Sequence, residues 1–465
     1  MKKTWNVTTP IDGSVIARRE LHGAADIERA LSRAVEAQQA WRQTEIGERV
    51  SYLKGFVQKF MSEAKAGGEE LTRQMGRPIA YSPLEVQRTG ERAEAMIEIA
   101  AASLADIVLP DKPGFHRYIK REPLGIVFVI PAWNYPYFIA VNGIVPALLA
   151  GNAVILRHSA VTPLCAEAFA RAFESAGLPE GLFQYLHLDH EDTALAIRDS
   201  RVNFVAYTGS VAGGHEIQKV LVDRFIDVNL ELGGKDPAYV RSDVHLEHAI
   251  ENLVDGSFFN SGQSCCGVER IYVHQDVYDP FLEGFLDLTR RYKLGNPLDP
   301  ATTLGPMAKK SGAAVVRAHI AEAVAKGAHA LIDPRLFPQT EMGENYLAPQ
   351  VLANVDHSMA VMVEETFGPV VGIMKVRGDE EAVRLMNDSP YGLTASIWTR
   401  DEDAARALGD RVDTGTVYMN RCDFLDPLLA WVGVKDTGRG CSLSKVAYER
   451  LTRPKSYHLR FQSAT

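Results

Sequence analysis

The sequence has few cysteines and no excess of basic residues. Five cysteines are spread over 465 residues, and 50 lysines and arginines stand against 59 acidic residues, giving a net charge of -9. An odd, sparse set of cysteines in so large a chain argues against a disulfide framework. The acidic balance argues against a nucleic-acid partner, because nucleic-acid-binding proteins present a basic face.

Long apolar runs and metal-binding motifs are also absent from the sequence. No run reaches the roughly 20 apolar residues that a membrane-spanning helix needs, and the lysines at positions 2 and 3 precede no apolar stretch. We therefore expect no membrane contact, no signal peptide and a cytoplasmic protein. Without a Cys-x-x-Cys pair or a Cys/His cluster, we expect no metal site.

Apolar residues, in contrast, are plentiful and regularly arranged. They make up 46% of the chain, enough for the cores of two or three domains. Residues 24–108 show mostly helical periodicity. Beyond them, short apolar runs predict buried strands at 125–130, 153–156 and 202–207, with helices predicted at 136–150 and 163–176. This alternation predicts an α/β fold with a parallel sheet, and a second α/β stretch fills 235–435.

Glycines and polar residues follow the predicted strands. In such sheets, ligands bind beyond the carboxyl ends of the strands, where 131–134, 157–159 and 208–210 fall. The Gly-Ser-x-x-x-Gly element at 209–214 opens a helix whose free N–H groups could receive a pyrophosphate. A glycine-rich turn without a ligand explains this element about equally well.

A thiol, a carboxylate and an amide stand out as candidate reactive groups. Cys265 follows a Gly-Gln turn, Glu231 precedes paired glycines in an apolar setting, and Asn134 follows a buried strand. A thiolate can attack a carbonyl carbon, and a partly desolvated carboxylate can take a proton from water. The Asn134 amide could donate to an oxyanion or merely stabilise its own turn. The residues alone leave an aldehyde or an ester as the substrate.

The chain also carries a series of motifs at 133–136, 151–154, 208–210, 230–235, 262–265, 364–369, 387–393 and 433–438. In this order and at roughly this spacing, they resemble the aldehyde dehydrogenase superfamily, in particular short bacterial enzymes of the succinate-semialdehyde dehydrogenase type. The resemblance covers nearly the whole chain. It implies a Rossmann-like NAD(P)-binding domain plus an α/β catalytic domain and a small oligomerisation sheet.

The resemblance also implies domain boundaries and an assembly. The expected ranges are 1–104 and 124–233 for cofactor binding, 234–436 for catalysis, and 105–123 and 437–465 for oligomerisation. The alternation of His458, Arg460 and Gln462 with Leu459 and Phe461 fits an edge-pairing strand. A homodimer or a tetramer built from dimers is expected.

The resemblance assigns roles to the reactive groups. Cys265 is the expected nucleophile, which forms a thiohemiacetal and then a thioester, and Cys266 is interpreted as a buried neighbour. Asn134 and the Cys265 backbone N–H form the expected oxyanion hole. Glu231 is the expected base for the deacylating water. Because members that transfer the acyl group to coenzyme A generally lack this Glu, its presence favours hydrolysis to the free acid.

The implied cofactor is NAD or NADP. The family's Lys-x-x-Glu after the second strand reads Arg157 and Ala160 here. An arginine fork suits a 2′-phosphate, and Ala160 does not repel one, so both cofactors remain open. The predicted cofactor-binding residues are Trp133, Arg157, Ser159, Gly209, Ser210, Gly214, Leu232, Glu365 and Phe367.

The predicted substrate pocket is mainly apolar. The arginines that anchor a distal carboxylate in the succinate-semialdehyde group are replaced by Asn142 and Phe259. Because burying an unpaired carboxylate is costly, we predict an uncharged aromatic or medium-chain aldehyde, with succinate semialdehyde as the alternative. Arg270 and Arg421 are weaker candidates for a cationic contact. The predicted pocket residues are Tyr135, Ile139, Asn142, Phe259, Ser264, Leu425 and Trp431.

Two other classes of function remain. An esterase or thioesterase could use Cys265 and Glu231 without redox chemistry, although Glu365, Phe367 and the 209–214 turn would then have no purpose. A non-catalytic scaffold could also keep the fold, but the presence of all three reactive groups argues against it.

Overall fold

The computed structural model describes residues 3–461. Its core begins with a six-stranded sheet of order β19-β9-β8-β5-β6-β7, parallel except for β19. Every residue of β5 and β6 is buried, which explains their continuous apolar sequences. The strands are β5 (Ile126–Ile130), β6 (Ala153–Leu156), β7 (Phe183–Tyr185), β8 (Val202–Thr208), β9 (Asp227–Glu231) and β19 (Gly438–Arg439).

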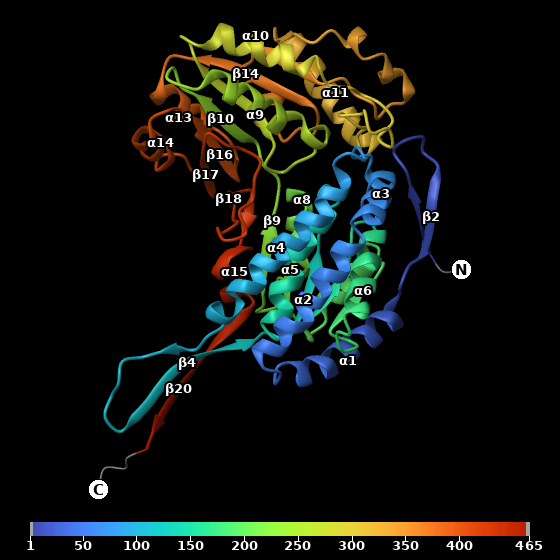
Figure 1. Ribbon diagram of the computed structural model, residues 1–465, viewed down its shortest axis with the longest axis vertical. Helices are drawn as coiled ribbons and strands as arrows, with labels where there is room; N and C mark the ends of the chain where they lie inside the picture. Colours follow the sequence, from blue (N-terminus) through green and yellow to red (C-terminus); the bar gives the residue numbers. More distant parts are fainter. Residues whose placement is uncertain (1–2, 462–465) are drawn as a thin grey trace.

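Helices of the N-terminal half pack against this sheet and against each other (Figure 1). Their apolar stripes form the core, as Ile27, Leu31 and Ala34 of α1 illustrate. The helices are α1 (Ala24–Trp41), α2 (Ile46–Ser62), α3 (Ala64–Met75), α4 (Ser82–Ser103), α5 (Pro136–Leu149), α6 (Leu164–Ser175), α7 (His190–Arg198) and α8 (Val211–Val220). An antiparallel hairpin of β1 (Thr4–Thr8) and β2 (Val15–Glu20) precedes them.

The strand order creates a ligand-binding edge in this sheet. From β5 the chain proceeds through β6 to β7 on one side, and then returns to place β8 on the other side of β5. The order therefore reverses between β5 and β8, and ligands of open α/β sheets bind at such a point. The segments that follow these two strands contain Asn134 and Gly209.

A seven-stranded sheet forms the second α/β unit, in the order β12-β13-β14-β11-β10-β16-β17. All its pairs are parallel except β12 with β13. The strands are β10 (Asp236–Val240), β11 (Val268–His274), β12 (His329–Ala330), β13 (Gln350–Ala353), β14 (Val370–Val376), β16 (Thr394–Trp398) and β17 (Thr416–Met419). Its helices are α9 (Leu246–Phe258), α10 (Tyr278–Thr289), α11 (Lys310–Ala325), α12 (Ala360–Val363), α13 (Asp379–Asn387) and α14 (Glu402–Gly409).

The parallel strands bring three distant loops to one edge of this second sheet. Residues 232–235 precede β10, 259–267 precede β11 and 364–369 precede β14. These loops carry most of the motifs that the sequence singled out. A short pair of β15 (Tyr391–Gly392) and β18 (Val434–Lys435) joins the C-terminal segment to the same unit.

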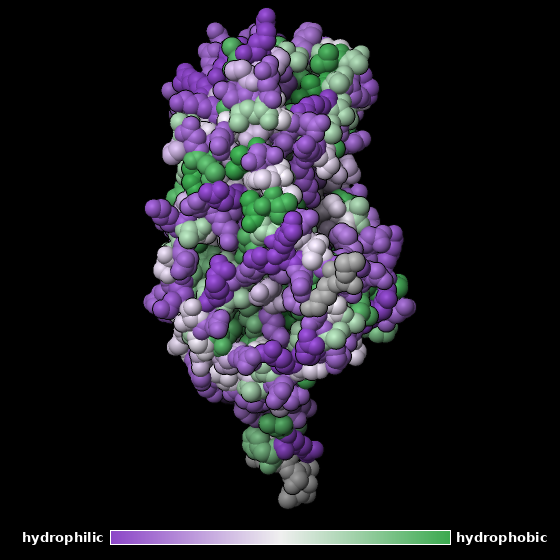
Figure 2. All heavy atoms as spheres, turned by 90° about the vertical axis from the view of Figure 1, so that its right-hand side faces the viewer, coloured by the Kyte–Doolittle hydropathy of each residue, from purple (hydrophilic) through white to green (hydrophobic). Residues whose placement is uncertain are grey.

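A three-stranded antiparallel sheet projects from the body as an arm (Figure 1). It consists of β3 (Ile107–Val108), β4 (Phe115–Pro123) and β20 (Thr452–Arg460), and β20 pairs with β4 along its whole length, from Thr452 opposite Pro123 to Arg460 opposite Phe115. Figure 2 shows hydrophobic atoms on this narrow projection. The predicted strand is present, but Gln462 lies outside the described residues.

The C-terminal segment 437–465, predicted to serve in oligomerisation, contributes to three parts of the fold. Gly438 and Arg439 of β19 pair with β9 in the six-stranded sheet, and α15 (Ser444–Arg450) packs against α4. Within this segment, β20 joins the arm. The predicted α/β architecture is confirmed, with parallel sheets in both units. Within residues 3–461, no helix is long and apolar enough to cross a membrane.

Candidate active site

A left-handed turn presents the candidate nucleophile. After α9, residues Asn260, Ser261 and Gly262 all have positive φ, at 53°, 57° and 69°. Such φ values are uncommon for residues other than glycine and persist only where neighbours fix them. Here the Ser261 hydroxyl donates to the Gly305 carbonyl at 2.8 Å, and Gln263 Nε2 donates to the Asn260 carbonyl at 2.9 Å. The turn thereby fixes the backbone that leads to Cys265.

The two adjacent thiols lie in different environments. Cys265 is half-buried, whereas Cys266 is 3% exposed. The Cys266 thiol and the Ser264 hydroxyl both donate to Asp423 Oδ1, at 3.0 and 2.9 Å. A hydrogen bond with Cys265 and burial raise the pKa of Cys266 well above its usual value. Since the thiolate is the reactive form, the more accessible Cys265 is the better candidate nucleophile.

Asn134 lies beside the turn that carries the thiol. Its Nδ2 donates to the Gln263 carbonyl at 3.2 Å. A side-chain amide has two N–H donors, so the second remains available to an oxyanion. The position of Asn134 is fixed by Arg77, which donates to its backbone carbonyl and pairs with Glu85. This buried arginine also contacts Asn260 Oδ1 at 3.1 Å, and so joins the loops of both α/β units.

Glu231 ends β9, is half-buried, and has three hydrogen-bond donors to its carboxylate. Asn229 Nδ2 donates to Oε1 at 3.1 Å, the Ser442 hydroxyl donates to the same oxygen, and the Thr208 hydroxyl donates to Oε2 at 3.2 Å. Burial raises the pKa of Glu231, although these three hydrogen bonds act in the opposite direction. A raised pKa brings a carboxylate closer to the range of a useful base near neutral pH.

A cavity of about 200 Å³ lies between the turn and the loop before β14. Trp133 and Phe367 meet at its wall with ring centroids 5.6 Å apart. Burial raises the pKa of Glu365 to about 7, and its Oε1 accepts a hydrogen bond from the Gly234 N–H at 3.0 Å. The aromatic faces of Trp133 and Phe367 and the carboxylate of Glu365 suit a flat ring attached to a ribose. The cavity is lined by Trp133, Gln263, Met307, Lys309, Gly312, Val315, Glu365, Thr366 and Phe367.

The start of α8 lies at the reversal point of the first sheet. The Ser210 hydroxyl caps this helix by accepting from the Gly213 N–H at 3.2 Å. Gly214 allows close packing on Leu232, because a Cβ there would lie 2.8 Å from a Leu232 methyl carbon. These features leave helix N–H groups facing the edge, an arrangement that fits a phosphate.

The residues after β6 complete that edge. Arg157 is buried, donates to the Leu188 carbonyl at 3.1 Å and lies 5.5 Å from the Trp5 ring centre. The Ser159 hydroxyl accepts from the Val161 N–H at 3.3 Å. Arg157 retains further guanidinium N–H groups for a ribose or phosphate. The residues present thus fit a dinucleotide.

The predicted pocket residues fall into three groups. Tyr135 lies under the Arg77 guanidinium, 4.5 Å from ring centre to carbon, and Phe259 packs on Tyr81 at 5.3 Å. Ile139 and Asn142 line a small cavity together with Glu231. The remaining three residues are Ser264, Leu425 and Trp431. The Ser264 hydroxyl donates to Asp423, and Leu425 packs on the main core. Trp431 is 5% exposed and pairs through its backbone with Ser442.

The two arginines considered as alternative cationic contacts have other roles. Arg270 is buried and donates to the backbone carbonyls of Lys235, Leu385 and Met386. Arg421 is exposed, and its guanidinium lies 3.3 Å from the Phe424 ring centre.

Sequence reasoning missed the residues that fix or surround the site through distant contacts. They are Arg77, Arg92, Lys309, Asp423 and Ser442, and no local sequence signal identifies them.

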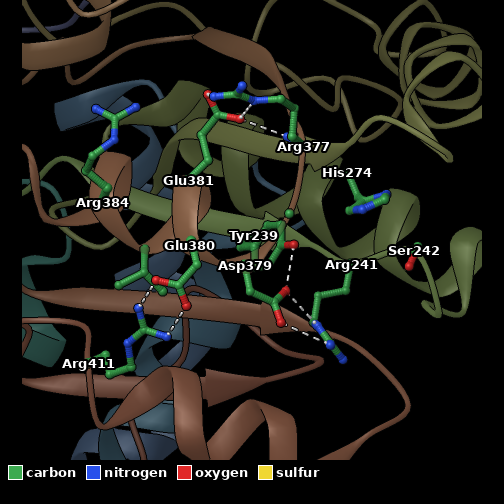
Figure 3. Close-up of a pocket in the computed structure, with 12 residues that line it drawn as sticks. Tyr239, Arg241, Ser242, His274, Arg377, Asp379, Glu380, Glu381, Arg384 and Arg411 are labelled. Atoms are coloured by element: carbon green, nitrogen blue, oxygen red, sulfur yellow. Dashed lines mark hydrogen bonds and ion pairs between the residues drawn. The ribbon is translucent and has the colours of Figure 1, made fainter.

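A larger cavity, of about 860 Å³, lies at the opposite edge of the second sheet (Figure 3). Six of its charged side chains form three ion pairs. Arg411 pairs with Glu380, Arg377 with Glu381, and Arg241 with Asp379. These compensated charges stabilise the surface around α13. Within residues 3–461, no group of three or more His, Cys, Asp or Glu side chains could hold a metal ion.

Comparison with known proteins places this site in context. A sequence model described as the aldehyde dehydrogenase family matches residues 1–457. Succinate semialdehyde dehydrogenase Sad from Escherichia coli (strain K12), an NAD(P)+ enzyme by name, is 34% identical over 436 residues, covering 94% of this chain and 93% of that protein. The 3,6-anhydro-alpha-L-galactose dehydrogenase from Vibrio sp. (strain EJY3) is 32% identical over 461 residues, covering 99% and 96%.

Solved structures agree with the sequence comparisons. The NADP-dependent glyceraldehyde-3-phosphate dehydrogenase from Bacillus halodurans C-125, complexed with NADP, superimposes with a TM-score of 0.93 at 28% identity. The match covers 99% of this chain and 96% of that one.

Proposed function

The chain belongs to the aldehyde dehydrogenase family, and on that basis we propose that it oxidises an aldehyde to the carboxylic acid with NAD or NADP. One observation carries the proposal: the turn bearing Cys265 contacts Asn134 at the carboxyl edge of the first sheet, beside residues that fit a dinucleotide. Relatives named for NAD(P)+ or complexed with NADP support the choice of cofactor.

The first half-reaction makes a thioester on Cys265. The thiolate attacks the aldehyde carbon, and a C–S bond forms while the carbonyl oxygen becomes negative. The second N–H of Asn134 and the Cys265 backbone N–H donate to that oxygen. NAD or NADP, when bound, would supply the acceptor for the hydride. Trp133, Glu365 and Phe367 would hold its nicotinamide ring and ribose.

The second half-reaction releases the acid. Glu231 removes a proton from a water molecule, which attacks the thioester carbon, and the C–S bond breaks to regenerate the Cys265 thiolate. Ser442, Asn229 and Thr208 keep the carboxylate oriented. The net reaction consumes one aldehyde, one water and one oxidised cofactor, and yields the acid, reduced cofactor and protons. Glu231 is the reason for proposing hydrolysis instead of acyl transfer to coenzyme A.

Relatives at similar identity act, by their names, on aldehydes with different far ends: a carboxylate, a neutral sugar and a phosphate. The substrate must therefore be inferred from this chain's own pocket. Tyr135 and Phe259 favour an aromatic or medium-chain apolar body. The prediction of an uncharged substrate rests on positions 142 and 259 alone. Cationic side chains from other parts of the fold also bear on the charge of the substrate's far end.

The projecting arm suggests a homo-oligomer. Val108, Leu459 and Phe461 on it are 78%, 48% and 68% exposed. Exposed apolar side chains on a sheet with an open edge are usually covered by another chain. We propose a dimer, or a tetramer built from dimers, and light scattering on the purified protein tests it.

The activity is tested by absorbance at 340 nm on mixing enzyme, cofactor and a panel of aromatic, aliphatic and carboxylate-bearing aldehydes. A cofactor-dependent rise supports the proposal. Hydrolysis of 4-nitrophenyl acetate without any aldehyde oxidation, in the presence of NAD or NADP, would instead favour the esterase. Iodoacetamide labelling of Cys265 that neither aldehyde nor cofactor affects, together with no turnover, would favour the scaffold.

A further inference from the structure

Arg92, on α4, is a buried cation that the proposed reaction does not use. It is 8% exposed, and its Nη1 makes two long hydrogen bonds of 3.4 Å, to the Phe138 carbonyl and to Asn142 Oδ1. Its guanidinium also lies 4.2 Å from the Phe138 ring centre. Among residues 3–461, no carboxylate forms an ion pair with it. A buried charge normally has a close counter-charge.

The nearest acid on its own helix already has other partners. Glu85 lies two turns earlier on α4 and pairs with Arg77. It also accepts the Tyr137 N–H at 2.9 Å and the Phe138 N–H at 3.3 Å. Glu85 therefore compensates Arg77 and the start of α5 directly. It acts on the Arg92 charge through space, without forming an ion pair with it.

The position of Arg92 connects it to the reaction. Its contact Asn142 lies on α5, which packs against α4 (Figure 1), and Asn142 lines a cavity with Glu231. The Arg92 charge interacts electrostatically with Glu85 and, more weakly, with Cys266 and Glu231. Burial lowers the pKa of Arg92 to about 10, so that it remains a cation at neutral pH.

We propose that Arg92 binds a carboxylate at the far end of the aldehyde, so that the substrate is the semialdehyde of a dicarboxylic acid. This inference rests on the proposed function. Asn142 is one of the two positions where the sequence lacks an expected arginine, and the structure supplies a guanidinium there from a residue 50 positions earlier. The apolar pocket accommodates the carbon chain, and Arg92 neutralises its end.

The geometry favours a carboxylate over a phosphate. One planar guanidinium can make two parallel hydrogen bonds to a carboxylate and match its single charge. A phosphate ester carries nearly two charges at neutral pH, and Arg92 would leave one of them buried without a partner. The Asn142 amide can add a further N–H to a carboxylate once its orientation adjusts.

The test compares substrates that differ in the far-end charge. Succinate semialdehyde, butanal and glyceraldehyde 3-phosphate are assayed with the wild type, Arg92→Gln, Arg92→Lys and Arg88→Gln. Arg88 is an exposed arginine one turn earlier on α4, and so provides the matched control. The values of kcat and KM are obtained separately for each combination of enzyme variant and substrate.

The wild type should use succinate semialdehyde with the highest kcat/KM of the three. Arg92→Gln should lower that value about 10- to 100-fold, as expected for loss of hydrogen bonds to a charged group, mainly through KM. For butanal, which has no far-end charge, the loss should be much smaller than for succinate semialdehyde. Arg92→Lys should restore part of the loss, and Arg88→Gln should behave as wild type.

A second measurement does not depend on turnover. Succinate should raise the melting temperature of the wild-type protein and of Arg88→Gln, but not that of Arg92→Gln. Equal losses of activity on succinate semialdehyde and butanal in Arg92→Gln would overturn the inference, and so would a wild-type preference for butanal or for the phosphate. In those outcomes aldehyde oxidation itself persists. Absence of oxidation of every aldehyde with either cofactor would instead refute the proposed function.

Discussion

Replacing Ser442 with alanine should shift the pH dependence of acid release. The Ser442 hydroxyl donates to Glu231, and of the three donors it does most to lower the pKa of that carboxylate. A hydrogen bond to a charged group contributes about 1.5–3 kcal/mol, and one pKa unit corresponds to about 1.4 kcal/mol. Because Asn229 and Thr208 remain, we expect a rise of about one pKa unit.

The sign of the effect follows from the protonation state that acts. Glu231 is a base only when it is ionised, so deacylation falls as the pH drops through its pKa. In Ser442→Ala this fall should begin at higher pH. Below the wild-type pKa the rate should drop up to about tenfold, whereas at alkaline pH the two enzymes should become equal.

The assay is the pH profile of kcat under conditions where a burst of reduced cofactor shows that deacylation limits turnover. Ser442→Thr keeps the hydroxyl and should restore the wild-type profile. Cys441→Ala, which removes the neighbouring half-buried thiol, should leave the profile in place. A uniform loss of rate at every pH in Ser442→Ala would refute the reasoning, because it would show that Ser442 acts on structure and not on ionisation.

Two further predictions concern stability. Glu365 has its pKa raised to about 7 by burial, against an ordinary value near 4.5, so its ionisation opposes folding increasingly as pH rises through this window. Glu365→Gln should therefore raise the free energy of unfolding of the cofactor-free protein more at pH 8 than at pH 5, by up to roughly 3 kcal/mol, and thermal melts at the two pH values measure this. Calorimetry should show weaker cofactor binding. An equal gain at both pH values would exclude ionisation as the cause. Gly262→Ala should cost more than the 1–3 kcal/mol of backbone strain and reduce kcat, because its Cβ would lie 2.3 Å from the Gly368 carbonyl oxygen. Gly177→Ala is the matched control, with φ of 72° and no atom within 4 Å of the added Cβ; equal losses of stability and kcat in both variants would contradict a role for the turn.

The fold could be predicted from the sequence because its signals are local and repeated. Strands β5 and β6 are apolar at every residue, and between them α5 opens with a proline in the expected rhythm. Strand β19, in contrast, was not predicted. Only two of its residues pair with β9, and so short a strand has no sequence signature of its own.

The candidate site was predictable to the extent that its residues belong to contiguous motifs. Cys265, Glu231 and Asn134 fall in such motifs, which is why the sequence singled them out. Their surroundings come from contacts between residues far apart in the chain. Arg77 contacts Asn134 across 57 positions, and Ser442 reaches Glu231 across 211. Whether Arg92 approaches Asn142 depends on how α4 packs on α5, which no pattern within either helix specifies.

The central claim is that Cys265 forms an acyl intermediate that Glu231 helps to hydrolyse. Rapid mixing of Glu231→Gln with aldehyde and cofactor, followed at 340 nm and by mass spectrometry of the quenched protein, tests it most directly. The account predicts a burst of about one reduced cofactor per active site, an acyl adduct on Cys265 and very slow turnover afterwards, with no burst in Cys265→Ala. Normal steady-state oxidation by Cys265→Ala, or wild-type turnover by Glu231→Gln, would contradict it.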